Sequence, residues 1–165
     1  MGNPLHFLVL CTGNSARSIL AEALLNYLGT GRVKAFSAGS KPAGRVNPFA
    51  LAVLAEAGIS VSDPRSKSWD EFAAPGAPTM DVVITVCDNA AGEVCPVWPG
   101  APIQVHWGFP DPAAVVGTDE EKRRAFRQVM GMIRPRIEAL LALDLEGMTA
   151  DEMKFKFLEL APIDG

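Results

Sequence analysis

The residues best suited to chemistry lie in one stretch near the N-terminus, where five residues separate Cys11 from Arg17. Gly13 and Asn14, inside that stretch, tolerate left-handed backbone angles that turn successive amides toward one point. Converging amides, the start of a helix and the planar Arg17 fork together suit a tetrahedral oxyanion. The same positive potential favours the thiolate form of Cys11, and Ser18 could donate a hydrogen bond to its sulfur. The predicted oxyanion-binding residues are Thr12, Gly13, Asn14, Ser15, Ala16, Arg17 and Ser18, with Cys11 as the nucleophile.

Two further cysteines, Cys87 and Cys95, complete a set of three, which is too few for a disulfide scaffold and indicates reduced thiols. Cys87 closes an apolar run, where a buried core position is a credible alternative to redox chemistry. Cys95 lies in a polar segment with Gly and Pro, which is a poor place for a core residue. A metal site is weakly supported, because seven residues separate the two cysteines and no His completes a tetrahedral ligand set.

The elements that must position these residues alternate between short apolar runs and helical patterns, and no repeat or linker divides the chain. We therefore predict a single domain over residues 1–165 of class α/β, a three-layer, flavodoxin-like fold with a four-stranded parallel sheet flanked by helices. In such sheets ligands lie beyond the carboxyl ends of the strands. The expected strands are Leu5–Leu10, Val33–Ser37, Asp81–Cys87 and Ile103–Trp107. The first expected helix begins after Ala16 and ends at Gly29, and the second runs from Pro48 to Gly58. The third spans Asp119–Leu143, although Gly131 and Pro135 interrupt its interior, and the fourth spans Thr149–Leu160.

The overall composition fits a globular protein, with 48% hydrophobic and 21% charged residues. A net charge of -4 and a pI near 5.2 argue against a nucleic-acid or anionic-membrane surface. No apolar run approaches the roughly 18 residues of a membrane span. The first ten residues lack the charged segment of a secretion signal, so we expect a cytoplasmic protein.

The stretch from Cys11 to Ser18, placed directly after a buried strand, resembles the low-molecular-weight tyrosine phosphatase superfamily and, within it, the arsenate reductases of that fold. The resemblance covers residues 5 to about 143. It implies the fold expected above and a covalent adduct between Cys11 and the oxyanion. The phosphatase branch shares Cys11, Gly13, Asn14, Arg17 and Ser18, so this stretch does not distinguish the two branches.

The segment around Asp111-Pro112 favours the reductase branch. Both branches of the superfamily keep an Asp-Pro here, which implies Asp111 as the general acid that protonates a departing oxygen. An exposed turn is the alternative interpretation, since Asp-Pro is common turn chemistry. Phosphatases of this fold usually continue with tyrosines that flank an aryl substrate, whereas Ala113 and Ala114 follow in this chain.

Cys87 and Cys95 match by position the pair of thiols that arsenate reductases of this fold carry after the third strand. The resemblance implies that Cys87 attacks the Cys11–arsenic adduct, releasing arsenite, and that Cys95 then takes over the disulfide. Catalytic residues are accordingly Cys11, Arg17, Asp111, Cys87 and Cys95. No bound cofactor is expected. An external thiol reductant, either thioredoxin or glutaredoxin with glutathione, would restore the enzyme.

Some relatives bind a potassium ion near this loop through Asn, Glu, Ser and Asp. Asn14, Glu22 and Ser37 match three of these ligands, and no aspartate matches the fourth, because Lys67 and its neighbours occupy that part of the chain. Lys67 can supply the positive charge directly, so we expect no metal ion and no potassium requirement.

The expected partners are arsenate, with phosphate or sulfate as mimics, and a thioredoxin or glutaredoxin, with no nucleic acid and no membrane; the chain is expected to act as a monomer. Two alternatives stay open. The first is a phosphatase of the low-molecular-weight tyrosine phosphatase type that hydrolyses phosphomonoesters, and the second is a non-catalytic oxyanion-binding or transcription-associated module. His6 and His106 are interpreted as structural residues at strand ends.

Overall fold

The computed structural model describes residues 4–61, 63–86, 98 and 100–162. Four strands form one sheet with the order β2-β1-β3-β4, and every neighbouring pair is parallel. The α/β class and the four-stranded parallel sheet are therefore confirmed. The strands are β1 (Leu5–Cys11), β2 (Val33–Gly39), β3 (Val82–Thr85) and β4 (Ile103–His106).

The chain reverses its direction of travel across the sheet between β1 and β3, because β2 lies on one side of β1 and β3 on the other. A crevice for ligands forms outside the carboxyl ends of strands at such a point. Cys11 is the last residue of β1, so the topology places its side chain at this position. The prediction that the chemistry lies at the carboxyl ends of the strands is thereby given a structural basis.

Two strands extend further than the sequence pattern indicates, since Cys11 and Gly39 pair in register at the ends of β1 and β2. The third strand is shorter than expected and ends at Thr85, although the Val86 amide still donates to the Leu10 carbonyl at 2.9 Å. Cys87, expected at the end of this strand, lies outside the described residues. The extension of β1 and β2 matters for the site because it brings Gly39 alongside the loop after Cys11.

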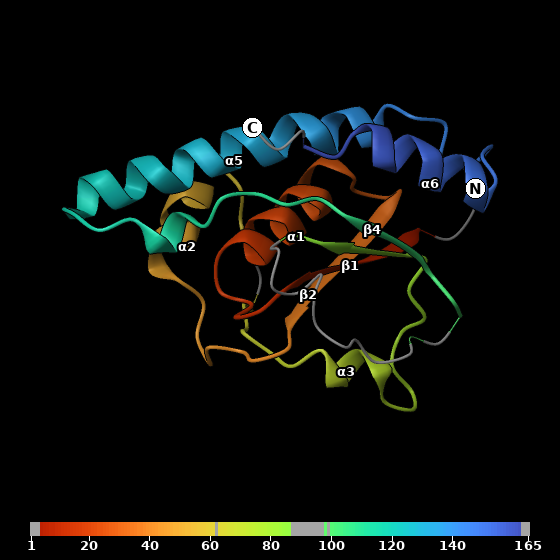
Figure 1. Ribbon diagram of the computed structural model, residues 1–165, viewed down its shortest axis with the longest axis horizontal. Helices are drawn as coiled ribbons and strands as arrows, with labels where there is room; N and C mark the ends of the chain where they lie inside the picture. The colour runs from red at the N-terminus through yellow and green to blue at the C-terminus, as the bar shows by residue number, and fades with distance from the viewer. Residues whose placement is uncertain (1–3, 62, 87–97, 99, 163–165) are drawn as a thin grey trace.

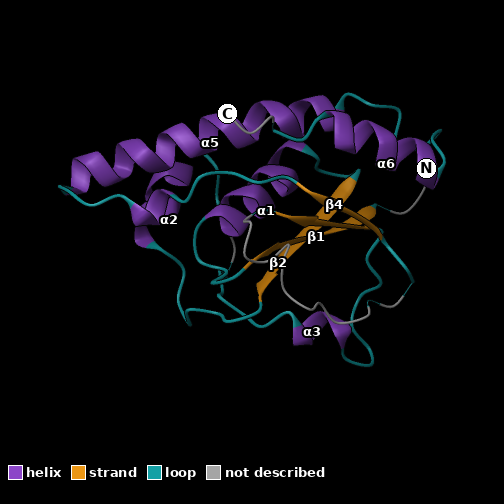
Figure 2. Ribbon diagram, viewed as in Figure 1, coloured by secondary structure: helices purple, strands orange, loops and turns teal. Residues whose placement is uncertain are grey.

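Helices cover both faces of the sheet unequally, as Figures 1 and 2 show. The face with the larger hydrophobic core carries four helices, whereas the smaller core on the opposite face lies under one short helix and irregular segments. The helices on the first face are α1 (Arg17–Leu28), α2 (Pro48–Glu56), α5 (Asp119–Leu141) and α6 (Ala150–Glu159), and the short helix is α3 (Asp70–Ala73). α3 and the 3-10 helix η1 (Pro112–Ala114) were not expected from the sequence.

Local capping signals explain where these helices begin. The Asn47 side chain accepts the Phe49 amide, and Pro48 occupies the first turn of α2, as the sequence predicts. Thr118 and Thr149 each form a capping box with the glutamate three residues later, so α5 and α6 start at defined positions.

Helix α5 runs through Gly131 and Pro135 without a break. A proline cannot donate to the carbonyl four residues earlier, and its ring crowds that carbonyl. In α5 that earlier residue is Gly131, and both residues are exposed. The lost hydrogen bond therefore falls on the solvent side, while Ile133 and Ile137 keep the inner side buried.

Within the described part of the chain, no helix combines the length and apolar character needed to cross a membrane.

Candidate active site

The loop from Thr12 to Ala16 joins β1 to α1, and the carbonyl oxygens of Thr12, Gly13 and Ser15 accept hydrogen bonds from segments outside the loop. Because a trans peptide plane holds its C=O and N–H on opposite sides, each amide that follows such a carbonyl points away from that carbonyl's partner. Amides on that opposite side are what the predicted oxyanion cradle requires. The contacts to the carbonyls are Lys41 N to Thr12 O (3.0 Å), Ala43 N to Gly13 O (2.9 Å), Ser66 Oγ to Gly13 O (2.8 Å) and Asn47 N to Ser15 O (2.9 Å).

Asn14 holds the loop from inside. Its side chain is fully buried, and its Nδ2 donates to both Ser18 Oγ and Ser37 Oγ at 2.9 Å. Its Oδ1 accepts the Lys67 amide at 2.9 Å. The backbone of Asn14 has φ 47°, the left-handed angle expected from the sequence. Gly13, expected to share that conformation, is not among the described residues with positive φ, so one asparagine alone supplies the turn.

The start of α1 carries no side-chain cap. Ala16 occupies the N-cap position with no side chain able to cap the helix, and the first turn contains no acidic residue. Uncapped amides at a helix N-terminus attract anions. Cys11 is buried, with 5% of its surface exposed. Ser18 accepts the bond from Asn14, which leaves its hydroxyl hydrogen available to donate toward a sulfur at the loop centre.

Arg17 connects the loop to the segment that carries Asp111. Its side chain is only 14% exposed, its Nη1 donates to the Phe109 carbonyl at 2.8 Å, and its Nη2 lies 3.8 Å from Asp111 Oδ2. The Arg17 Nε is buried and has no hydrogen-bond partner among the residues that the structure describes. A buried donor without a partner is costly, and an oxyanion in the loop would satisfy it.

Asp111 is both a turn residue and a neighbour of the loop. Its Oδ1 accepts the Ala113 amide at 3.0 Å and so caps η1, while its other oxygen faces Arg17. The carboxyl is 43% exposed, which leaves it open to exchange protons with water. The turn interpretation and the acid interpretation are therefore compatible, because one oxygen serves each.

Lys67 lies beside Glu22 and Ser37, two of the side chains that the sequence analysis matched to potassium ligands. Its Nζ is 3.8 Å from Glu22 Oε1 and 3.5 Å from Ser37 Oγ, and it donates to the Arg65 carbonyl at 3.1 Å. Burial lowers the pKa of Lys67, and the carboxylate of Glu22 opposes that shift. The Lys67 ammonium thus lies beside Glu22 and Ser37, two of the three side chains matched to ion ligands. The backbone amide of Lys67 donates to the third, Asn14.

Gly39 is a site residue that sequence reasoning missed. A Cβ placed on it would overlap the Thr12 carbonyl oxygen and approach Cys11 O to 2.9 Å and Asn14 N to 3.0 Å. The amide and carbonyl of Gly39 also bond the segment that carries Lys67, through Lys67 O and Trp69 N, each at 2.9 Å. The only sequence signal was a glycine at the end of a predicted strand, since the clash depends on how two distant segments meet.

The two histidines have structural partners, as interpreted from the sequence. The His6 ring contacts the Thr79 carbonyl at 3.0 Å, and the His106 ring contacts Thr85 Oγ1 at 2.7 Å across β3 and β4. The predicted relay thiols Cys87 and Cys95 lie outside the described residues.

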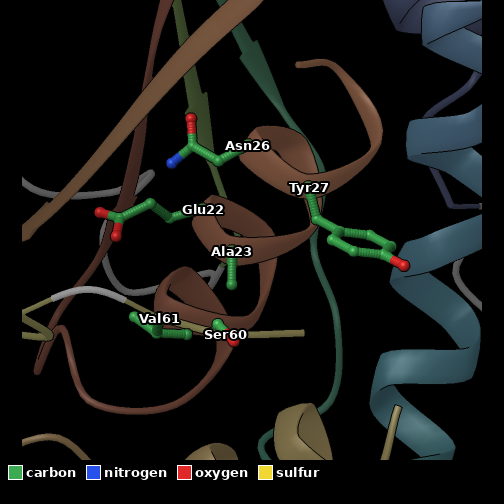
Figure 3. A pocket seen from close by; sticks show the side chains of 6 residues that line it. All are labelled: Glu22, Ala23, Asn26, Tyr27, Ser60 and Val61. Atoms are coloured by element: carbon green, nitrogen blue, oxygen red, sulfur yellow. The ribbon is translucent and has the colours of Figure 1, made fainter. Parts of the chain in front are cut away.

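A cavity of about 260 Å³ lies on the outer side of α1, and Figure 3 shows the side chains that line it. Its lining includes Glu22, the partner of Lys67, but none of Cys11, Arg17 or Asp111. The cavity is therefore separate from the oxyanion loop. The other lining residues are Ala23, Asn26, Tyr27, Ser60 and Val61.

Residues 6–152 match the family described as low molecular weight phosphotyrosine protein phosphatase. An arsenate reductase of Halalkalibacterium halodurans is 45% identical over 130 residues, which are 78% of this chain and 89% of that protein. A glutaredoxin arsenate reductase of a Synechocystis species is 33% identical over 133 residues, covering 81% and 93% of the two chains. Among solved structures, the arsenate reductase of Archaeoglobus fulgidus superimposes with a TM-score of 0.64 at 31% identity, covering 83% of this chain and 99% of that one.

Substituting Gly39 by Ala should weaken anion binding, because the new Cβ must push the Thr12 carbonyl and rotate the peptides that form the cradle. We expect the Kd for inorganic phosphate to rise about tenfold, in keeping with the cost of overpacking a tight contact. Isothermal titration calorimetry measures it. Gly131→Ala is the matched control, since a Cβ there meets nothing within 4 Å; equal affinities for Gly39→Ala and the unmodified protein would contradict the proposed contact.

Replacing K⁺ by Na⁺ at constant ionic strength should leave the phosphate Kd unchanged within about twofold, because the Lys67 ammonium already neutralises Glu22. Lys67→Met should weaken binding by leaving the Glu22 carboxylate uncompensated beside the loop. Burial lowers the pKa of Lys67 below its ordinary 10.5, so the side chain loses its positive charge at a lower pH than an exposed lysine does. The affinity for phosphate should therefore fall as the pH rises through this lowered pKa. Affinity that increases sharply with potassium over sodium would show that an ion is needed.

Proposed function

Because this chain belongs to the low molecular weight phosphotyrosine protein phosphatase family and its relatives described above are arsenate reductases, we propose that it reduces arsenate to arsenite with Cys11 as nucleophile. The observation that carries the proposal is the loop itself. It combines carbonyls bonded to segments outside the loop, a helix start without a side-chain cap and a buried Arg17 Nε that has no partner among the described residues. Arsenate and phosphate have the tetrahedral oxyanion geometry for which such a loop is suited.

In the first step, the Cys11 thiolate attacks arsenic and a hydroxide leaves. Asp111 protonates that hydroxide, so that water departs and an S–As(V) bond remains. Arg17 supports both partners of this step, because one nitrogen lies near Asp111 Oδ2 and its buried Nε is open to an anion oxygen.

The next step transfers two electrons to arsenic. The Cys87 thiolate attacks the Cys11 sulfur, the electron pair of the S–As bond moves to arsenic, and arsenite leaves as As(III). Cys95 then attacks the Cys87 sulfur and expels the Cys11 thiolate, which leaves a Cys87–Cys95 disulfide. An external thiol reductant opens that disulfide, and each cysteine returns to its starting state.

Support for the relay comes from the described residue that precedes Cys87 in the chain. The Val86 amide donates to the carbonyl of Leu10, the residue before Cys11, at 2.9 Å. The Val86 carbonyl accepts the Phe109 amide at 3.1 Å, next to the segment with Asp111. The chain thus enters the predicted relay segment directly beside the strand that ends in Cys11.

Hydrolysis of phosphomonoesters is the alternative from the same family, and the loop and Asp111 would serve it equally well. The residues after Asp111 favour the reductase, because η1 consists of Pro112, Ala113 and Ala114 and offers no aromatic side chain for an aryl group. A glutaredoxin-linked relative supports an external thiol as reductant, and we propose a thioredoxin or a glutaredoxin with glutathione in that role.

Cys87→Ser should abolish steady-state arsenate reduction, because no thiolate is then present at position 87 to attack the Cys11 sulfur and release arsenite. Any slow hydrolysis of p-nitrophenyl phosphate should persist, since that reaction uses Cys11, Arg17 and Asp111 alone. Arsenite production measured with thioredoxin and with glutaredoxin plus glutathione, in separate assays, checks the result and identifies the reductant. Loss of both activities would point to misfolding, and retention of arsenate reduction would exclude Cys87 from the relay.

Treating the unmodified protein with arsenate without reductant should trap the Cys87–Cys95 disulfide, whereas Cys95→Ser should trap Cys11–Cys87. Peptide mapping by mass spectrometry distinguishes the two linkages. A glutathione adduct on Cys11 in place of either disulfide would establish a different resolving route.

A further inference from the structure

We propose that helix α6 positions the general acid, acting through Trp107, an inference that rests on the role proposed for Asp111. α6 spans Ala150–Glu159, whereas the family match ends at residue 152. Most of the helix, including Phe157, therefore lies beyond the part of the chain that the family describes. α6 packs against β4, the strand from which the segment to Asp111 departs.

Phe157 anchors α6 to the sheet. Its side chain is fully buried in the main hydrophobic core, and its ring centroid lies 6.1 Å from that of Phe7 on β1. Neighbouring residues on the same helix face outward, and Phe155 is 62% exposed. The contact is thus made by one face of α6, on which Phe157 is the one fully buried side chain and Met153 packs, partly buried, against the same core.

The backbone carbonyl of Phe157 accepts the indole Nε1–H of Trp107 at 2.9 Å in a buried hydrogen bond. The last four carbonyls of a helix have no partner within it, and Phe157 is among the last residues of α6. Trp107 therefore supplies a bond that the helix cannot make for itself. In return, the indole ring, which is fully buried, is fixed in orientation.

Trp107 passes this constraint to the acid along a short path of chain. Its amide donates to the Thr85 carbonyl at 2.7 Å, and two residues later the Phe109 amide donates to Val86 O. The Phe109 carbonyl accepts from Arg17, and Asp111 follows two residues further on. The segment is held by α6 at Trp107 and by Arg17, the first residue of α1, at Phe109, so α6 sets the start of the chain that carries the acid.

A double-mutant cycle tests this positioning role. Asp111→Asn should slow the first-turnover release of arsenite, measured by rapid quench with enzyme in excess, about a hundredfold. Trp107→Phe keeps an aromatic ring but lacks the N–H, and should slow the same step about tenfold while changing the phosphate Kd less than about twofold. In the Asp111→Asn background, Trp107→Phe should slow the step less than about twofold, because its effect acts through the acid.

Each outcome decides a separate question. If Asp111→Asn has no effect, the acid role in the proposed function is wrong. If Asp111→Asn slows the step but Trp107→Phe has no effect, or slows it by the same factor in both backgrounds, the positioning role of α6 is wrong and the acid role stands. Phe157→Leu, which loosens the anchor from the helix side, repeats the cycle should Trp107→Phe not fold, and Phe155→Ala on the exposed side of α6 is the matched control.

Discussion

The structure of the site depends on the three hydrogen bonds of one buried amide. Asn14 must adopt a left-handed backbone angle for the loop to turn its amides inward, and that angle is unfavourable for a residue with a Cβ. The bonds to Ser18, Ser37 and the Lys67 amide stabilise it. They also join α1, β2 and the segment before α3, so the same amide that shapes the loop holds together the three elements around it. Such preorganised dipoles stabilise developing charge without rearrangement during the reaction.

Local signals predicted the elements well because they depend on near neighbours. The apolar run before Cys11, the Asn47-Pro48 pair and the start of α5 at Asp119 each specify structure within a few residues. The parallel sheet followed from the alternation of these elements. Contacts between distant segments were inaccessible to this reasoning. The need for Gly39 and the approach of the Trp107 indole to Phe157 depend on tertiary packing. The helices α3 and η1 are too short to produce a helical periodicity in the sequence.

The placement of Lys67 shows what resemblance adds to physical reasoning. No periodicity links Lys67 to Glu22 and Ser37. Three side chains of this chain matched the potassium ligands of relatives, the fourth ligand, an aspartate, had no match, and Lys67 in that part of the chain indicated that a lysine supplies the positive charge. The structure brings the ammonium to both groups. A covalently attached cation need not be captured from solvent, and its burial is tolerated because a carboxylate lies beside it. Asp111 and Arg17 form a comparable pair at the other side of the loop, although with a more exposed carboxylate.

The close approach of Gly39 to the Thr12 carbonyl also bears on how this protein discriminates between arsenate and phosphate. The loop packs tightly against the end of β2, and densely packed groups resist small changes in shape. The loop therefore cannot adjust its width to bind one tetrahedral anion and exclude another of similar size. Phosphate should therefore occupy the pocket readily. Selectivity for arsenate over phosphate then arises after binding, because arsenic accepts the electron pair of its bond to sulfur more readily than phosphorus does. Phosphate is therefore expected to act as a reversible competitive inhibitor.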